Sequence, residues 1–285
     1  MIALRKLFLV AGALAACLCL PRAAPSAEAL SEEEKHDLYS QAKDLFRQAN
    51  QSAASDPAKA KDLYRQGAMR FERLAGGGVR SGRLYYNTGN AYFRMGDLGR
   101  AILNYRRAER YIPGDQNLAQ NLDYARSRRR DRIEEPQRAR VLKTVFFWHY
   151  DLSPGARSVV FACCFAAFWL GASIRLFRRG AVPQGALAFL GLVAALFLGS
   201  LLAETFAQAH DQPGVILAEE TIARKGDGES FEPAFKEPLH AGTEFNLIEG
   251  RRDWLQIELP DGQRCWVRER DVGLVAAVAT KPARY

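Results

Sequence analysis

Cysteine and histidine are scarce in this sequence, and neither is spaced for a metal site or a disulfide framework. The five cysteines and four histidines include no CxxC pair and no Cys/His cluster, which excludes the common zinc modules. The phosphate-binding GxxxxGKS/T loop, the metalloprotease HExxH motif and the hydrolase GxSxG motif are missing as well. We therefore expect neither an enzyme nor a protein with a bound metal or cofactor.

Acidic residues are outnumbered by basic ones, 32 against 40, which gives a net charge of +8. No recognised nucleic-acid motif accompanies this excess, so nucleic acid is not an expected partner. Attraction to an anionic membrane surface or to an acidic partner explains the charge more economically. Part of the excess lies in Arg126–Arg132. This run is either the solvated end of a helix or a site for an acidic partner or lipid headgroups.

Charge is missing altogether from three apolar stretches, Leu7–Leu20, Ser158–Ile174 and Gly185–Ala203. The first follows a basic start and precedes a small-residue segment, which predicts a signal peptide over residues 1–27. Lipoprotein processing with acylation at Cys17 and an uncleaved anchor are the alternatives. Because apolar and charged residues are distributed so unevenly along the chain, a single soluble globule is excluded.

The other two stretches predict transmembrane helices over residues 157–177 and 185–204, with a pair of buried core helices as the alternative. The short basic loop 178–184 between them belongs in the cytoplasm. This predicts a two-pass protein of the bacterial inner membrane with both soluble parts in the periplasm. Small residues recur at every fourth position and predict the faces along which the two helices pack: Cys163, Ala167 and Gly171 in the first helix, and Gly191, Ala195 and Gly199 in the second.

Aromatic residues gather at Phe146–Tyr150, just before the first predicted span. Such a run is typical of a membrane interface, so we expect His149 to be an interfacial residue and not a ligand. No acid or lysine lies within the charge-free runs Ser158–Ile174 and Gly185–Ala203, which argues against an ion or proton path.

Residues 30–140 have the 3.6-residue apolar period of α-helices. Ser31–Glu34 has the form of a capping box, and Asp56-Pro57 begins a second helix with proline at its first position. The apolar spacing within Asn117–Arg130 predicts a further helix, which caps the helical domain with its apolar side inward.

Between them, residues 82–115 resemble a tetratricopeptide repeat. The signature positions carry Tyr85, Gly89, Tyr92, Ala101, Tyr105, Ala108 and Pro113. Gly89 and Ala101 remove side chains where two helices of a hairpin cross, which allows an axis separation of about 8 Å. Because one repeat cannot bury its own faces, we expect the two upstream helices to form a degenerate first repeat.

The resemblance implies that the first helix of the repeat binds a partner through its concave face. The matching residues are Arg83, Tyr86, Asn87, Asn90, Phe93 and Arg94. A general peptide groove, a carboxylate clamp made by Arg83, Asn87 and Asn90, and a purely structural repeat are the three interpretations.

Residues 213–275 change to the two-residue period of short strands, with Asp261-Gly262 as a hairpin signal. Five strands are expected, at Val215–Leu217, Glu220–Ala223, Glu244–Ile248, Trp254–Leu259 and Arg264–Val267. The segment resembles a bacterial SH3-type domain, a small all-β barrel, followed by a flexible tail at 276–285. Phe245, Trp254 and Trp266 either line a peptide or glycan groove or fill the core of the barrel.

The order of signal, repeat, two spans and SH3-type domain resembles the BatE-like proteins of the Bacteroides aerotolerance operon type. This implies a non-enzymatic scaffold of an inner-membrane Bat/MoxR-type envelope complex. Its partners would be von Willebrand A-domain membrane proteins and, indirectly, a MoxR-type AAA+ ATPase. The alternative is a membrane protein that binds or senses peptidoglycan through its SH3-type domain. The expected fold class is a multidomain membrane protein with an all-α repeat domain, a two-helix transmembrane hairpin and a small SH3-like barrel.

Overall fold

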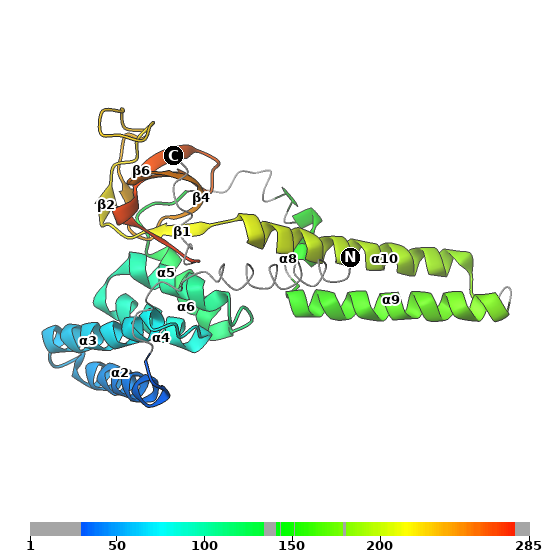
Figure 1. The fold of residues 1–285 in the computed structure, drawn as a ribbon, viewed down its shortest axis with the longest axis horizontal. Coiled ribbons are helices and arrows are strands. Elements are labelled where there is room, and N and C mark those ends of the chain that lie inside the picture. The colour runs from blue at the N-terminus through cyan, green and yellow to red at the C-terminus, as the bar shows by residue number, and fades with distance from the viewer. Residues whose placement is uncertain (1–29, 134–140, 143, 151, 179–180, 277–285) are drawn as a thin grey trace, which may run out of the picture.

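The computed structural model describes residues 30–133, 141–142, 144–150, 152–178 and 181–276. The predicted signal peptide with Cys17, and nearly all of the predicted tail, lie outside this part of the chain. The described part holds eight α-helices and an antiparallel sheet of five strands. In Figure 1 two long helices lie side by side and extend away from a body in which the N-terminal helices lie beneath the sheet.

The helical part begins with two helices whose predicted starts are confirmed. Helix α2 (Glu32–Ser52) starts at a capping box, in which the Ser31 hydroxyl accepts from the Glu34 backbone N–H and the Glu34 carboxylate accepts from the Ser31 N–H. Helix α3 (Pro57–Gly76) is capped by the Asp56 side chain and has proline at its first turn. The start of an α-helix leaves four backbone N–H groups without a partner in the helix. At α2 the capping box satisfies two of them.

Three shorter helices follow, α4 (Gly82–Met95), α5 (Leu98–Glu109) and α6 (Gln116–Ser127). Helices α2 and α3 form one hairpin, α4 and α5 form a second, and α6 packs on α5. The predicted close crossing in the second hairpin is present. A Cβ atom added to Gly89 would lie 2.6 Å from the Tyr105 ring and 3.2 Å from the Ala101 carbonyl oxygen.

Two further helices, α9 (Pro154–Phe177) and α10 (Gln184–His210), are long and apolar enough to cross a membrane. The short helix α8 (Phe147–Tyr150) precedes them. The predicted packing faces are confirmed at two positions and wrong at the other four. A Cβ atom added to Gly171 would lie 2.8 Å from Leu187, and one added to Gly191 would lie 3.4 Å from Phe168. The other four predicted contact residues are exposed: Cys163, Ala167, Ala195 and Gly199. On α10 the buried residue beside Gly191 is Ala194 and not Ala195.

The C-terminal part forms strands β1 (Pro213–Ile216), β4 (Glu244–Arg251), β5 (Trp254–Glu258), β6 (Arg264–Arg268) and β7 (Val272–Leu274). They pair in the order β6-β5-β4-β1-β7, and all pairs are antiparallel. A separate pair consists of β2 (Glu220–Thr221) and β3 (Leu239–His240). The sequence did not predict β3 or β7. Within the described residues no ladder joins β6 to β7, so the sheet is open.

One hydrophobic cluster is shared between the helices and the sheet, and the sheet has a second cluster of its own. Val215 and Val275 from the sheet pack with Ile102 and Leu103 from α5. The approach is close, because a Cβ atom added to Gly99 of α5 would lie 2.7 Å from the carbonyl oxygen of Ile216. Interiors packed to this density transmit displacement between their elements. The N-terminal helices and the C-terminal sheet are therefore packed together as one body.

Candidate protein-interaction site

The predicted partner-binding residues follow one another along α4, and we call them the α4 strip: Arg83, Tyr86, Asn87, Asn90, Phe93 and Arg94. Their spacing of three and four residues places them along one side of the helix. Arg83 and Arg94 are exposed near its two ends, and the four residues between them are half-buried. The strip thus combines two exposed cationic ends with an aromatic and amide centre.

Hydrogen bonds tie the centre of the strip to the neighbouring helices. The Asn87 amide donates to the Tyr39 hydroxyl of α2 at 3.1 Å. The Asn121 amide of α6 donates to the Tyr86 hydroxyl at 2.9 Å and to Asn90 Oδ1 at 3.0 Å. Since α2, α4 and α6 are joined in this way, Tyr86, Asn87 and Asn90 are held in fixed positions.

An aromatic pair extends the strip onto α6. The rings of Phe93 and Tyr124 lie 5.6 Å apart, and Tyr124 is 56% exposed. Sequence analysis missed Tyr39, Asn121 and Tyr124, although all three are polar or aromatic residues on helices flanking the repeat. Together with the strip they form a surface of aromatic rings, amides and cations, which is the composition of many protein interfaces.

Arginine residues at the end of α6 join the helices to the sheet. Glu244 at the start of β4 accepts from Arg126 at two positions, each 2.8 Å away, and from Arg129 at 3.1 Å. Arg106 of α5 lies 3.2 Å from the same carboxylate. The Arg126–Arg132 run is therefore not simply a solvated helix end. The acidic partner of Arg126 and Arg129 is the sheet of this same chain.

Electrostatics favour this junction when Glu244 is ionised. Burial by itself raises the pKa of Glu244, but the hydrogen bonds and charge of Arg126, with the charges of Arg106 and Arg129, outweigh burial and leave the pKa below its ordinary value. The ion pair is stabilised by a bidentate geometry that arginine offers to a carboxylate.

A second polar contact lies beside the first. Asp131 accepts from the His240 backbone N–H at 2.7 Å and from the Thr243 hydroxyl at 2.6 Å, and its other oxygen lies 2.6 Å from His240 Nδ1. Burial acts to raise the pKa of Asp131, but these hydrogen bonds outweigh it and lower the pKa. Asp131 thus ties the chain after α6 to the strand β3 and the turn that follows it.

The predicted groove residues of the sheet are all buried. Phe245, Trp254 and Trp266 each expose less than a tenth of their surface. The guanidinium groups of Arg268 and Arg251 lie 5.1 Å and 5.2 Å from the ring centroids of Trp254 and Trp266. A ligand that stacked on either indole would have to displace an arginine first.

A polar cluster between α9 and α10 was not predicted. Arg157 is only 2% exposed; it donates to Glu204 and to Ser200, the latter at 2.9 Å, and lies 3.1 Å from His149 Nδ1. His149 is therefore more than an interfacial residue. The sequence signal that could have predicted this cluster is a pair of opposite charges, with Arg157 at the start of α9 and Glu204 near the end of α10. The cluster joins α8, α9 and α10 at that end of the hairpin.

Comparison with protein-family models, with curated proteins and with solved structures gives no match to this chain in any of the three searches.

Proposed function

We propose that the chain is a non-enzymatic, membrane-anchored scaffold that binds protein partners through the α4 strip. In this proposal α4 and α5 form a tetratricopeptide repeat, and the sheet with β2 and β3 is a small SH3-type domain. The hairpin of α9 and α10 spans the bacterial inner membrane with both soluble parts in the periplasm. The resemblance to BatE-like proteins supports a place in a Bat/MoxR-type complex, with von Willebrand A-domain membrane proteins as direct partners.

One observation carries the proposal, the arrangement of Tyr86, Asn90 and Phe93 between two exposed arginines. Binding energy at protein interfaces is concentrated in a few aromatic and arginine anchors. The hydrogen bonds from Asn121 hold Tyr86 and Asn90 before any partner arrives. Preorganised side chains lose less conformational entropy on binding, so the same contacts give a higher affinity.

The link to the membrane supports a scaffold rather than a freely diffusing adaptor. Helix α10 ends at His210 and β1 begins at Pro213, so two residues separate the apolar hairpin from the sheet. The sheet in turn shares its core with α5. A partner on the α4 strip would consequently be held at a fixed place relative to the end of the hairpin.

The test is copurification of a co-expressed von Willebrand A-domain membrane protein with the detergent-solubilised full chain. The strip variant carries Phe93→Ala and Arg94→Glu. Its matched control carries Met69→Ala and Arg65→Glu on α3, where both side chains are exposed. We expect the strip variant to recover at least about tenfold less partner than the control, because two anchors are lost.

Equal recovery from both variants, with both retaining the thermal transition of the unaltered chain, would overturn the α4 strip as the binding site. Peptidoglycan sedimentation of the full chain is the second arm. If the full chain sediments with purified peptidoglycan and the strip variant recovers its partner normally, a wall-binding protein replaces the scaffold.

A further inference from the structure

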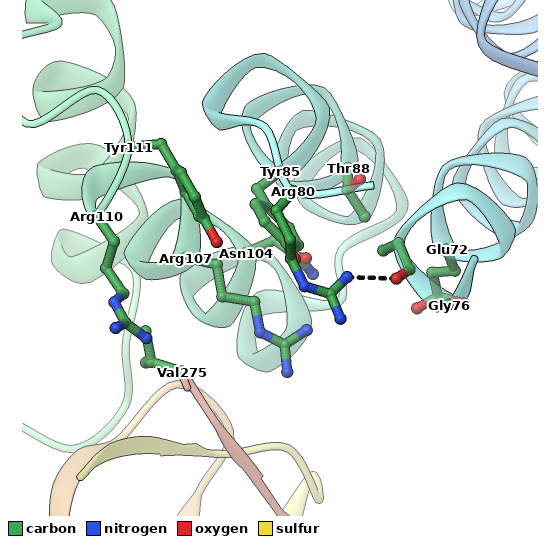
Figure 2. Close-up of a pocket in the computed structure, with 11 residues that line it drawn as sticks. Glu72, Gly76, Arg80, Tyr85, Thr88, Asn104, Arg107, Arg110, Tyr111 and Val275 are labelled. Carbon is green, nitrogen blue, oxygen red and sulfur yellow. Dashed lines mark hydrogen bonds between the residues drawn. The ribbon is translucent and has the colours of Figure 1, made fainter. Parts of the chain in front are cut away.

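A pocket lies where α3, α4 and α5 meet the chain just after β7, and none of the α4 strip residues lines it (Figure 2). Its volume is about 320 Å³. Three arginines line it: Arg80 before α4, Arg107 within α5 and Arg110 at the end of α5. None of these three arginines has a role in the α4 strip.

The three guanidinium groups have no carboxylate partner among the described residues. Arg80 donates to the carbonyl oxygens of Ala75 and Val79, and Arg107 donates to the Leu274 carbonyl oxygen at 2.9 Å. Glu72 is the acidic member of the described lining, and its carboxylate already accepts from the Tyr92 hydroxyl at 2.5 Å. With three guanidinium groups and one carboxylate in the described lining, the pocket keeps a net positive charge.

Within the described part of the chain, the arginine next to Arg107 has carboxylate partners, unlike the three arginines of the pocket. Arg106, one position before Arg107, pairs with Glu109 and with Glu244. Arg107 lines the pocket instead, where burial, helped by the Arg80 charge, outweighs the interactions with Tyr85 and Glu72 and lowers the pKa of its guanidinium. A cation that is partly withdrawn from water and only partly compensated by opposite charge destabilises the folded chain, and a bound anion would relieve that cost.

The wall of the pocket suits a planar anion on a short apolar stem. The rings of Tyr85 and Tyr111 are stacked, with centroids 5.8 Å apart, and both residues line the pocket. Figure 2 shows them beside the arginine side chains. Arginine binds a carboxylate through two parallel hydrogen bonds, and the aromatic faces can cover the methylene groups that carry it.

We infer that this pocket binds a side-chain carboxylate of an acidic peptide segment from a partner protein. A peptide is favoured over a lipid headgroup because the lining comes from α3, α4, α5 and Val275, and none of it comes from the apolar helices α9 and α10. The site is separate from the α4 strip, so it stands whether or not the strip binds a partner.

The experiment measures binding of a fluorescent, N-acetylated and C-amidated tetraglutamate peptide to the full chain in neutral phosphatidylcholine nanodiscs at low salt. The pocket variant carries Arg80→Gln and Arg110→Gln, both exposed residues whose loss leaves the core intact. The matched control removes the same charge at the exposed Arg47 and Arg128. Arg110→Gln alone serves as a second variant with the smallest effect on folding.

We expect the double pocket variant to bind the peptide at least about tenfold more weakly than the control variant, since each charge-assisted hydrogen bond contributes about a tenfold change. A tetraglutamine peptide should not bind. Equal losses in the pocket and control variants, or no binding of tetraglutamate to the unaltered chain at 10 mM (roughly the weakest useful affinity), would overturn the site. Stronger displacement of the peptide by inorganic phosphate than by acetate, or preferential binding of phosphatidylglycerol vesicles to the unaltered chain over the pocket variant, would overturn the acidic-peptide assignment.

Discussion

Arg126 forms a bidentate ion pair with Glu244. Its Nε atom lies 2.8 Å from one carboxylate oxygen, and its Nη2 atom lies 2.8 Å from the other. The two residues are 118 positions apart, and the whole hairpin of α9 and α10 lies between them in the chain. Glu244 is 17% exposed, so the pair is partly withdrawn from water. Ion pairs of this kind fix the register of two surfaces that an apolar contact alone would leave less well defined.

Replacing Glu244 by glutamine should loosen the junction between helices and sheet. The variant leaves Arg126, Arg129 and Arg106 without their shared counter-ion, so we expect the free energy of unfolding to fall by about 2–5 kcal/mol at pH 7. Thermal denaturation of the detergent-solubilised chain measures it. Glu249→Gln is the control, because its ion pair with Arg251 is exposed and should contribute less than about 1 kcal/mol. Equal shifts in the two variants would contradict the role of Glu244.

Acid should weaken the same junction. The pKa values of Glu244 and Asp131 are lower in the folded chain than their ordinary values of 4.5 and 3.8. Their contribution to stability is therefore present above those ordinary values and is lost as the pH falls through the folded pKa values. We expect the melting temperature to drop below about pH 4. Glu244→Gln combined with Asp131→Asn should show a flatter profile there, and an unchanged slope would count against this assignment.

The crossing at Gly89 is tested by adding a single methyl group. Gly89→Ala places a carbon 2.6 Å from the Tyr105 ring, which should cost about 1–3 kcal/mol of stability. Gly76→Ala is the matched control, since it lies at the end of α3 with nothing within 4 Å of the added carbon. That change should be neutral or stabilise by up to about 1 kcal/mol. If both variants melt alike, the two helices of the hairpin are not in close contact at Gly89.

Local signals in the sequence predicted the helix starts well. The Ser31–Glu34 capping box and the Asp56-Pro57 start depend on residues within one turn, and both are present. The Gly89 crossing was predictable too, because a small residue at that spacing has few other uses in a helical hairpin. Strands β3 and β7 were missed, since two or three residues are too short to show a period.

Long-range contacts could not be read from the same patterns. Nothing local to Arg126 distinguishes it from Arg128, yet one is tied to Glu244 and the other is exposed. The face of α10 was misassigned for a related reason. Small residues were taken to mark the contact, which holds at Gly171 and Gly191 but not at Ala195. The repeat of small residues also gave no sign that Arg157 would be held by Ser200 and Glu204 of α10.

The corrected packing face makes a direct comparison possible between two adjacent alanines. Ala194 is buried against α9, and Ala195 is exposed. Ala194→Leu should force the helices apart and cost about 1–3 kcal/mol, whereas Ala195→Leu should have little effect. Thermal denaturation in detergent, with disulfide cross-linking between cysteines placed at positions 171 and 187, measures both the stability and the separation. A larger effect from Ala195→Leu would restore the face predicted from the sequence.

Sidedness is tested with single cysteines and a membrane-impermeant maleimide in intact spheroplasts. Cysteines at the exposed positions Ser55 and Lys236 should react, because both soluble parts are proposed to be periplasmic. A cysteine at Ala181, in the basic loop, should react only after the membrane is permeabilised.

The background for these variants replaces every native cysteine except Cys265. Burial raises the pKa of the Cys265 thiol to about 12 and keeps it unreactive while the sheet is folded. Because the helical part shares its core with the sheet, Ser55 and Lys236 must react from the same side. Labelling of Ala181 alone in intact spheroplasts would reverse the proposed orientation, and labelling of only one of the two soluble positions would contradict the shared body itself.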